Sequence, residues 1–236
     1  MRWQDRDDRG VALPLVMAAI LLLSTLGAAL ILTTSAESLV AGHFRSGIEA
    51  LSAAGAIVER AAADLRAVPD WTLVLNGSIQ SPFLDGMPGG VRTLPSGSTV
   101  NLTQIVNQAN CGRDGLCAGP EMDAVSAERP WGRNNPRWRV FASGRLAELI
   151  GAPGSLYVVA LVADDGMEND GNPEADGTSI GGIPNQGFGL LALRGEAFGA
   201  GGVRRTVQAT VARGDTVGLG PGSLPRLRIL AWHEMR

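Results

Sequence analysis

The sequence predicts an α+β protein in which one long N-terminal helix packs on an antiparallel β-sheet. Residues 11–36 contain no charged side chain, and apolar residues continue beyond them at helical spacing. The C-terminal half carries several short segments with strand composition, separated by many of the 32 glycines. A helix with one apolar face and a sheet with another form a stable fold by packing together as layers.

Composition and charge narrow the classes of function. The 236 residues are 45% hydrophobic and 18% charged, a balance typical of a folded chain rather than a disordered one. The formal net charge is −3 and no long basic run occurs, so nucleic-acid binding is not predicted. Two cysteines and two histidines are too few for a zinc site of ordinary spacing.

Residues 11–36 are predicted to form the transmembrane part of the N-terminal helix. The hydrocarbon core of a bilayer needs ~20 consecutive apolar residues in a helix, and this uncharged stretch is longer. It ends at Glu37. We expect a single-pass protein of the inner membrane, with residues 1–10 on the cytoplasmic side and the rest of the chain outside the cytoplasm.

Residues 37–68 are predicted to continue the helix as an amphipathic segment that ends before Pro69. Apolar residues recur every three or four positions, which places them on one helix face. These residues are Val40, Phe44, Ile48, Leu51, Gly55, Val58, Ala62 and Leu65. Because glycine weakens a helix, we expect a local break near Gly42.

This N-terminus resembles that of a type IV prepilin. A short polar leader ends in Arg9-Gly10, an apolar helix begins at Val11, and an amphipathic extension follows. The stretch AESLVAGHFRSGIEALSAAGAIVERAAADL is similar to PilX-like minor pilins, as are the later runs WGRNNPRWRVFASGRL and LYVVALVADD. The resemblance is most specific over residues 9–66.

The resemblance implies a pilin-like fold and a role in pilus assembly or initiation. Prepilin peptidase would cleave after Gly10 and leave Val11 as the first mature residue. Further partners would be the lipid bilayer, the inner-membrane assembly platform, and other major and minor pilins; the assembled protein would be extracytoplasmic or pilus-associated. Leu15 stands where most major pilins carry a glutamate, which favours a minor or initiating subunit over a bulk one.

Three other interpretations of the N-terminus stay open. A cleaved secretory signal would end at the small residues Thr34-Ser35-Ala36, although the apolar region of a signal peptide is shorter than this one. A plain membrane anchor would carry the same helix without processing. A minor pseudopilin would have the same kind of N-terminal helix but would assemble in a type II secretion system instead of a pilus.

Residues 69–236 are predicted to form an extracytoplasmic, β-rich globular domain. We expect about four antiparallel strands packed on the helix, with a hairpin turn at residues 198–202. The clearer strand candidates are residues 137–146, 155–164, 188–197 and 203–213, and the weaker ones are residues 71–77 and 98–106. Leu227, Ile229 and Ala231 alternate with other residues near the C-terminus and predict an extra edge strand.

Cys111 and Cys117 are predicted to form a disulfide. The orientation of the span places both outside the cytoplasm, where thiols oxidise. A bridge across so short a loop contributes ~2.4 kcal/mol in the chain-entropy model. The alternative is two free thiols; a redox centre is not predicted, because the reactive motif is C-x-x-C.

An acidic loop is predicted after the strand at residues 155–164. Six carboxylates occur between Asp164 and Asp176, and they repel one another unless they are solvated or bound to a hard cation. Calcium, the one cofactor that we consider, would take oxygen ligands from Asp165, Asp170, Asn172, Glu174 and Asp176. The alternative is a solvated loop, because Ile183 stands where an EF-hand carries its last glutamate.

No enzyme activity is predicted. Residues 177–181 match G-x-S-x-G, and Asp215 and His233 follow downstream. That motif needs a buried strand before the serine and a helix after it, whereas an acidic loop precedes Ser179 here. A membrane-anchored hydrolase is therefore the weakest of the functions considered.

Trp131, Arg137, Trp138 and Arg139 lie close together in the run ERPWGRNNPRWRV. Arginine and aromatic side chains of this kind form binding surfaces through stacking. The alternative is a structured loop that enters a strand.

Overall fold

The computed structural model describes residues 12–151, 153–168, 170–177, 187–216 and 225–235. The chain divides into two compact units, residues 1–46 and residues 47–236. The boundary falls inside helix α1 (Ala12–Leu65), which continues through Gly42 without interruption. The expected break near Gly42 is therefore wrong.

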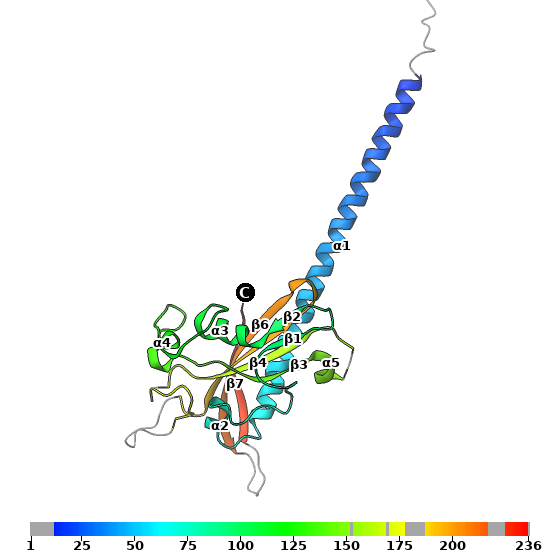
Figure 1. The fold of residues 1–236 in the computed structure, drawn as a ribbon. Coiled ribbons are helices and arrows are strands. Elements are labelled where there is room, and N and C mark those ends of the chain that lie inside the picture. Colours follow the sequence, from blue (N-terminus) through cyan, green and yellow to red (C-terminus); the bar gives the residue numbers. More distant parts are fainter. Residues whose placement is uncertain (1–11, 152, 169, 178–186, 217–224, 236) are drawn as a thin grey trace, which may run out of the picture. The chain divides into compact units, whose positions relative to one another are not determined.

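Short helices and strands make up the rest of the second unit (Figure 1). The helices are α2 (Thr72–Leu75), α3 (Leu102–Cys111), α4 (Gly119–Met122) and α5 (Leu146–Ile150), with 3-10 turns η2 (Gly132–Asn134) and η3 (Ala200–Gly202). The strands are β1 (Val91–Thr93), β2 (Thr99–Asn101), β3 (Arg139–Arg145), β4 (Tyr157–Asp164), β5 (Leu190–Phe198), β6 (Arg204–Thr216) and β7 (Pro225–Met235).

Among the described residues, five strands form the main sheet in the order β3-β4-β5-β6-β7, and each pairs antiparallel with its neighbour. Strand composition in the sequence located β3 to β6, and alternation located β7. Strand β7 is the predicted extra edge strand, and η3 lies in the predicted hairpin turn between β5 and β6. The α+β arrangement of a long N-terminal helix packed on an antiparallel sheet is confirmed.

Residues 47–65 of α1 pack on one face of this sheet. The buried helix residues are mostly small: Gly47, Ala50, Ala53, Ala54, Ile57, Val58, Ala61, Ala62 and Leu65. They meet the inward side chains of β5 and β6, including Leu193 and Ala209. Small residues on both layers bring the helix axis close to the sheet, so dispersion contacts form along the whole interface.

The prediction of which helix face packs on the sheet is therefore wrong in part. Val58, Ala62 and Leu65 are buried as predicted, but Ile48 is 49% exposed. The predicted face was chosen by its large apolar residues. The packed face is centred on alanines, which contribute little to a hydrophobic pattern. The large apolar residues at the N-terminal end of the predicted face remain uncovered.

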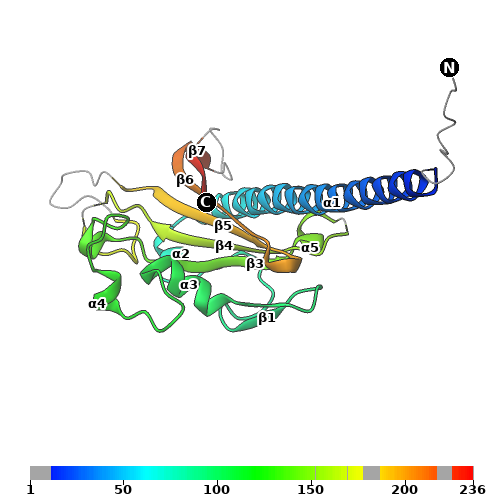
Figure 2. The same cartoon turned by 90° about the horizontal axis from the view of Figure 1, so that it is seen from above.

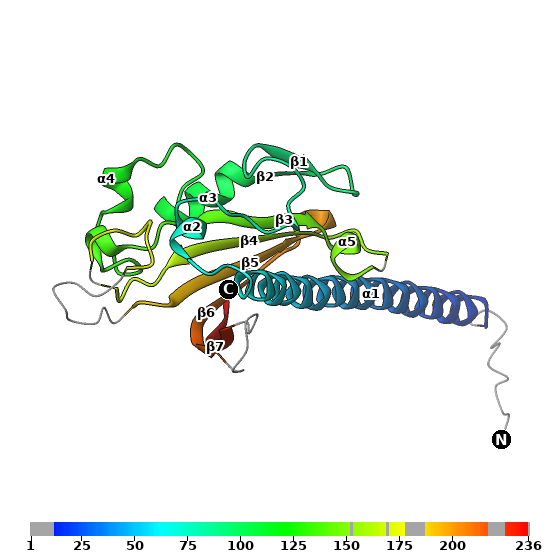
Figure 3. The same ribbon diagram turned by 90° about the horizontal axis from the view of Figure 1, so that it is seen from below.

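The opposite face of the sheet is covered over β3 and β4 by α3, as Figures 2 and 3 show. Leu102 and Ile105 of α3 are buried with Val159 and Leu161 of β4 in a second apolar cluster. The strand predicted at residues 98–106 is therefore wrong beyond residue 101. The side chain of Asn101 accepts hydrogen bonds from the backbone N–H groups of Thr103 and Gln104 and so starts a helix.

The segment at residues 71–77, a weaker strand candidate, forms the single-turn helix α2 instead. The carboxylate of Asp70 accepts a hydrogen bond from the N–H of Thr72, and Trp71 is buried against the end of α1. The indole N–H of Trp71 donates to the carbonyl oxygen of Leu65 at 3.2 Å. This buried contact holds Trp71 against the end of α1 and turns the chain there, so residues 71–77 do not extend as a strand.

The two edges of the sheet differ. Residues 81–85 cover the β3 edge through three backbone hydrogen bonds, each 3.0 Å long. The N–H groups of Ser81 and Asp85 donate to the carbonyl oxygens of Phe141 and Ser143, and the N–H of Ser143 donates to the carbonyl oxygen of Phe83. The carboxylate of Asp85 then accepts from the hydroxyl of Tyr157 at 2.8 Å. At the other edge, Ile229, Leu230, Trp232 and Met235 of β7 are each at least 40% exposed.

Candidate functional site

The first unit contains a helix that the rest of the described chain leaves uncovered. Apart from Gly27, every residue from Ala12 to Arg45 is exposed. This part of α1 is long and apolar enough to cross a membrane, and it is the one such helix in the described residues. The predicted transmembrane helix thus has the length and composition that a membrane span requires.

A stripe of large apolar residues continues along α1 past the uncharged stretch. Val40, Phe44 and Ile48 lie four residues apart and therefore share one helix face. They are 68%, 70% and 49% exposed. We call these three residues the exposed stripe. An isolated exposed apolar residue is ordinary, but an aligned row of three on a rigid helix is typical of a contact surface.

A hollow of about 550 Å³ lies in the second unit, beside Ile48. Its apolar lining comes from Ile48 on α1, from Leu146 and Ile150 on α5, and from Leu156. Ile150 is 52% exposed, so the hollow opens to the surface. The hollow is large enough to take a large apolar side chain of a partner.

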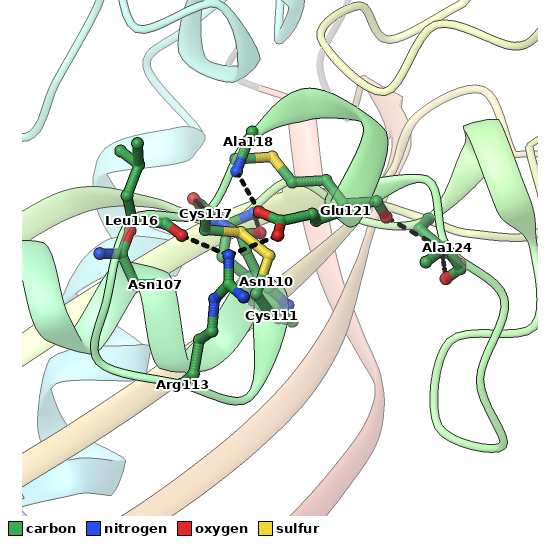
Figure 4. Close-up of a disulfide and its surroundings, with 12 residues drawn as sticks. Asn107, Asn110, Cys111, Arg113, Leu116, Cys117, Ala118, Glu121 and Ala124 are labelled. Carbon is green, nitrogen blue, oxygen red and sulfur yellow. Dashed lines mark hydrogen bonds and ion pairs between the residues drawn. A yellow bond between two sulfur atoms is a disulfide. The ribbon is translucent and has the colours of Figure 1, made fainter.

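The disulfide that the sequence predicts joins Cys111 to Cys117, with the two Cα atoms 5.9 Å apart (Figure 4). It ties the end of α3 to the chain before α4. Inside the closed loop, Arg113 donates to the carbonyl oxygen of Leu116 at 2.6 Å and to the carboxylate of Glu121 at 2.5 Å. The loop is thus held rigid, yet Leu116 is 83% exposed.

The residues predicted as calcium ligands are engaged elsewhere in the structure. Asp170 and Asn172 accept hydrogen bonds from backbone N–H groups two residues on, and Asp165 does the same for Met167. Glu174 contacts Arg139 at 3.0 Å. Within the described ranges, no group of three or more His, Cys, Asp or Glu side chains is placed to hold a metal ion.

The acidic loop contains three buried carboxyl groups instead. Asp164, Glu168 and Asp176 are 3%, 1% and 6% exposed, so the loop is not the fully solvated one considered as the alternative. Burial raises the pKa of all three, because a charged carboxylate loses its hydration there. Asp176 accepts a hydrogen bond from the N–H of Gly189 at 2.7 Å, which ties the loop to the start of β5.

Asp164 and Glu168 share a hydrogen bond between their carboxyl groups. Burial is the main reason that both pKa values are raised, and the hydrogen bond raises the pKa of Asp164 further. A protonated carboxyl group donates where a carboxylate only accepts. One proton shared by the pair is therefore enough to form this bond.

Several predicted positions lie outside the described residues. These are the processing site at Gly10 and Val11 and the central Ser179 of the serine motif. His233, which follows the serine motif in the sequence, is exposed on β7.

The Trp/Arg run contributes to a cleft that sequence reasoning located only in part. Trp131 and Trp138 both line a cleft of about 460 Å³ on the face of the sheet away from α1. Arg137 and Arg139 do not line it; they contact Glu174 at 3.6 and 3.0 Å. The sheet residues that complete the cleft come from β5 and β6, far away in the sequence, and no local signal marks them.

Comparisons with models of protein families, with curated proteins and with solved structures find no match for this chain.

Proposed function

We propose that this chain is a minor type IV pilin-like subunit that assembles with other subunits through α1. The observation that carries the proposal is the division of one continuous helix into two kinds of surface. Residues 47–65 are packed on a sheet, whereas residues 12–45 expose their apolar side chains almost throughout. The packed half fixes the helix to a folded domain, and the exposed half is left for a membrane and for partners.

Two successive environments would cover the exposed half. Before assembly, a lipid bilayer would bury it, because an uncharged helix of this length spans the hydrocarbon core. After assembly, the apolar helices of other pilins would replace the lipid. The exposed stripe and the hollow beside Ile48 extend the same apolar surface beyond the span, which suits contacts with neighbouring subunits.

The N-terminal sequence supports the prepilin form of this proposal. A short polar leader ending in Gly10 precedes the helix directly, and prepilin peptidase would cut before Val11. Leu15 brings no carboxylate into the span, so this subunit would not neutralise the terminal amine of a neighbour. A minor or initiating position needs fewer such contacts than a bulk position does.

We further propose that the protein works by assembly and not by catalysis. The groups that carry shifted pKa values in the acidic loop are explained by burial and by the hydrogen bonds that close the loop. Such ion-pair and hydrogen-bond networks perturb pKa values without any chemistry.

Crosslinking in the native membrane tests the assembly role. A photoreactive aromatic residue placed at Phe44 should crosslink to other single-span subunits, and the same residue at Leu116, an exposed apolar site on the disulfide loop, should not. Gly10→Trp, which blocks processing, should abolish the Phe44 crosslink while the protein stays in the membrane. Crosslinks from Phe44 to lipid alone, in cells that assemble pili, would rule the proposal out.

A further inference from the structure

The face of the sheet turned away from α1 carries a polar cleft, and we propose that it binds a neutral, hydroxyl-rich saccharide. The cleft has a volume of about 460 Å³. Pockets for small ligands occupy ~300–1,000 Å³. It lies between strands β5 and β6 on one side and the chain from α3 to Trp138 on the other. The inference does not rest on the assembly role, since the cleft uses no residue of α1.

The floor of the cleft is a row of polar side chains set by strand alternation. Leu193 and Ala209 face α1, so their neighbours Arg194, Gln208 and Thr210 face the cleft. Arg194 lies directly opposite Gln208 in the ladder between β5 and β6. A guanidinium, an amide and a hydroxyl side by side supply both donors and acceptors, as neighbouring sugar hydroxyls require.

An aromatic ring forms part of the wall. A Cβ atom at Gly166 would lie 2.6 Å from the indole Cδ2 of Trp131, so the ring rests directly on the Gly166 backbone. Trp131 is nevertheless 42% exposed and lines the cleft, so part of its surface is open to a ligand. The face of an aromatic ring is negative, and it attracts the weakly positive C–H groups that line one face of a pyranose ring.

The wall is also firmly held. Trp138 is 8% exposed, and the side chain of Asn110 bonds to the Trp138 backbone twice, at 2.7 and 2.9 Å. Asn135 fixes Trp131 by accepting from its backbone N–H at 3.0 Å. A site preorganised in this way loses little conformational entropy when a ligand binds.

Charge selects against an anionic ligand. The cleft is lined by two guanidinium groups, Arg129 and Arg194, and by four carboxyl groups, Glu121, Glu128, Asp164 and Asp165. Arg194 is also paired with the buried carboxylate of Glu196 at 2.8 Å. A phosphate, a nucleic acid or a strongly acidic peptide would meet carboxyl groups more often than guanidinium groups. A neutral polyol meets no such repulsion.

The cleft continues into a second hollow of about 600 Å³, which shares Gln108, Arg194 and Met235 with it. The second hollow runs on along β6 to Arg204 and Thr206. A groove of this extent suits a chain of several sugar units rather than a single one. The ligand class is therefore a neutral oligosaccharide.

Titration of the full-length protein with defined sugars tests the inference. The protein is kept in a zwitterionic detergent, because alkyl glycosides would compete, and is titrated by calorimetry with cello-, chito- and malto-oligosaccharides and with polyglutamate. We expect at least one oligosaccharide to bind with a Kd of about 1 mM or tighter. Weaker binding of all three, or binding of polyglutamate alone, overturns the inference.

Paired variants then locate the site. Trp131→Ala should raise the Kd at least about ten-fold, and Trp131→Phe should restore most of the affinity. The matched control is Trp232→Ala, because Trp232 is 43% exposed but lies on β7 outside the cleft. Gln208→Leu gives an independent test on the floor, should Trp131→Ala fail to fold. Unchanged affinity in both Trp131→Ala and Gln208→Leu would contradict the assignment.

Discussion

Gly195 of β5 lies directly against Ala54 of α1, so closely that a Cβ atom on Gly195 would collide with the carbonyl oxygen of Ala54. The same Cβ would approach side-chain methyl groups of Val58 and Ile57 at 2.6 and 3.1 Å. The backbones of the helix and the sheet therefore approach each other directly at this point. The contact sets the distance between the two layers of the second unit.

Gly195→Ala is expected to destabilise the second unit by about 1–3 kcal/mol, because one added methyl group in a full interface forces the layers apart. Chemical denaturation of the full-length protein in detergent measures the change. The control is Gly115→Ala in the disulfide loop, where a Cβ meets nothing within 4 Å. An equal effect of the two substitutions would argue against close packing at Gly195.

The disulfide between Cys111 and Cys117 is expected to stabilise the fold locally. Replacing both cysteines by serine should lower the free energy of unfolding by about 2 kcal/mol, since the open loop gains conformational entropy in the unfolded chain. Peptide mapping without reductant should recover residues 111 and 117 on one linked fragment. Alkylation of both thiols in unreduced protein from the native membrane would disprove the bridge.

The acidic loop is expected to make stability fall as pH rises. Burial raises the pKa of Asp164 to about 10 in the folded protein, against ~3.9 for an unfolded aspartate. Between these values the folded state holds a proton that the unfolded state lacks. The stabilising contribution is therefore complete below pH ~4 and is lost progressively up to pH ~10, at up to ~1.4 kcal/mol per pH unit.

Asp164→Asn removes this titration while keeping a donor toward Glu168. The slope of unfolding free energy against pH between pH 5 and 8 should become less negative by up to ~1.4 kcal/mol per unit. Glu168 and Asp176 act in the same direction, so part of the slope remains. An identical slope in wild type and Asp164→Asn would refute the protonated pair.

Local pattern predicted the strands well and the contacts between layers poorly. Strand composition located β3 to β6 and alternation located β7, because both are properties of residues close together in the sequence. The helix face was misplaced because its packed residues are alanines, whose role depends on a glycine more than a hundred residues away in β5. Helix α3 was overlooked although Asn101 followed by Gln104 resembles a capping pair.

The acidic loop shows a second reason why sequence falls short. Six carboxylates within thirteen residues suggested either bound calcium or exposure to solvent, and both environments keep the carboxylates ionised. The structure buries three of them, and burial raises their pKa values, so they are protonated more readily than solvated carboxylates. Protonation depends on burial, which is a property of the fold and not of the spacing.

The intact mass of the protein, purified from its native membrane, tests the prepilin account most directly. The account predicts a chain that begins at Val11, and a Gly10→Trp variant that keeps Met1 or its successor at the N-terminus while remaining in the membrane. A wild-type chain that retains residues 1–10 in cells with active prepilin peptidase, or one that begins after Ala36, would contradict it.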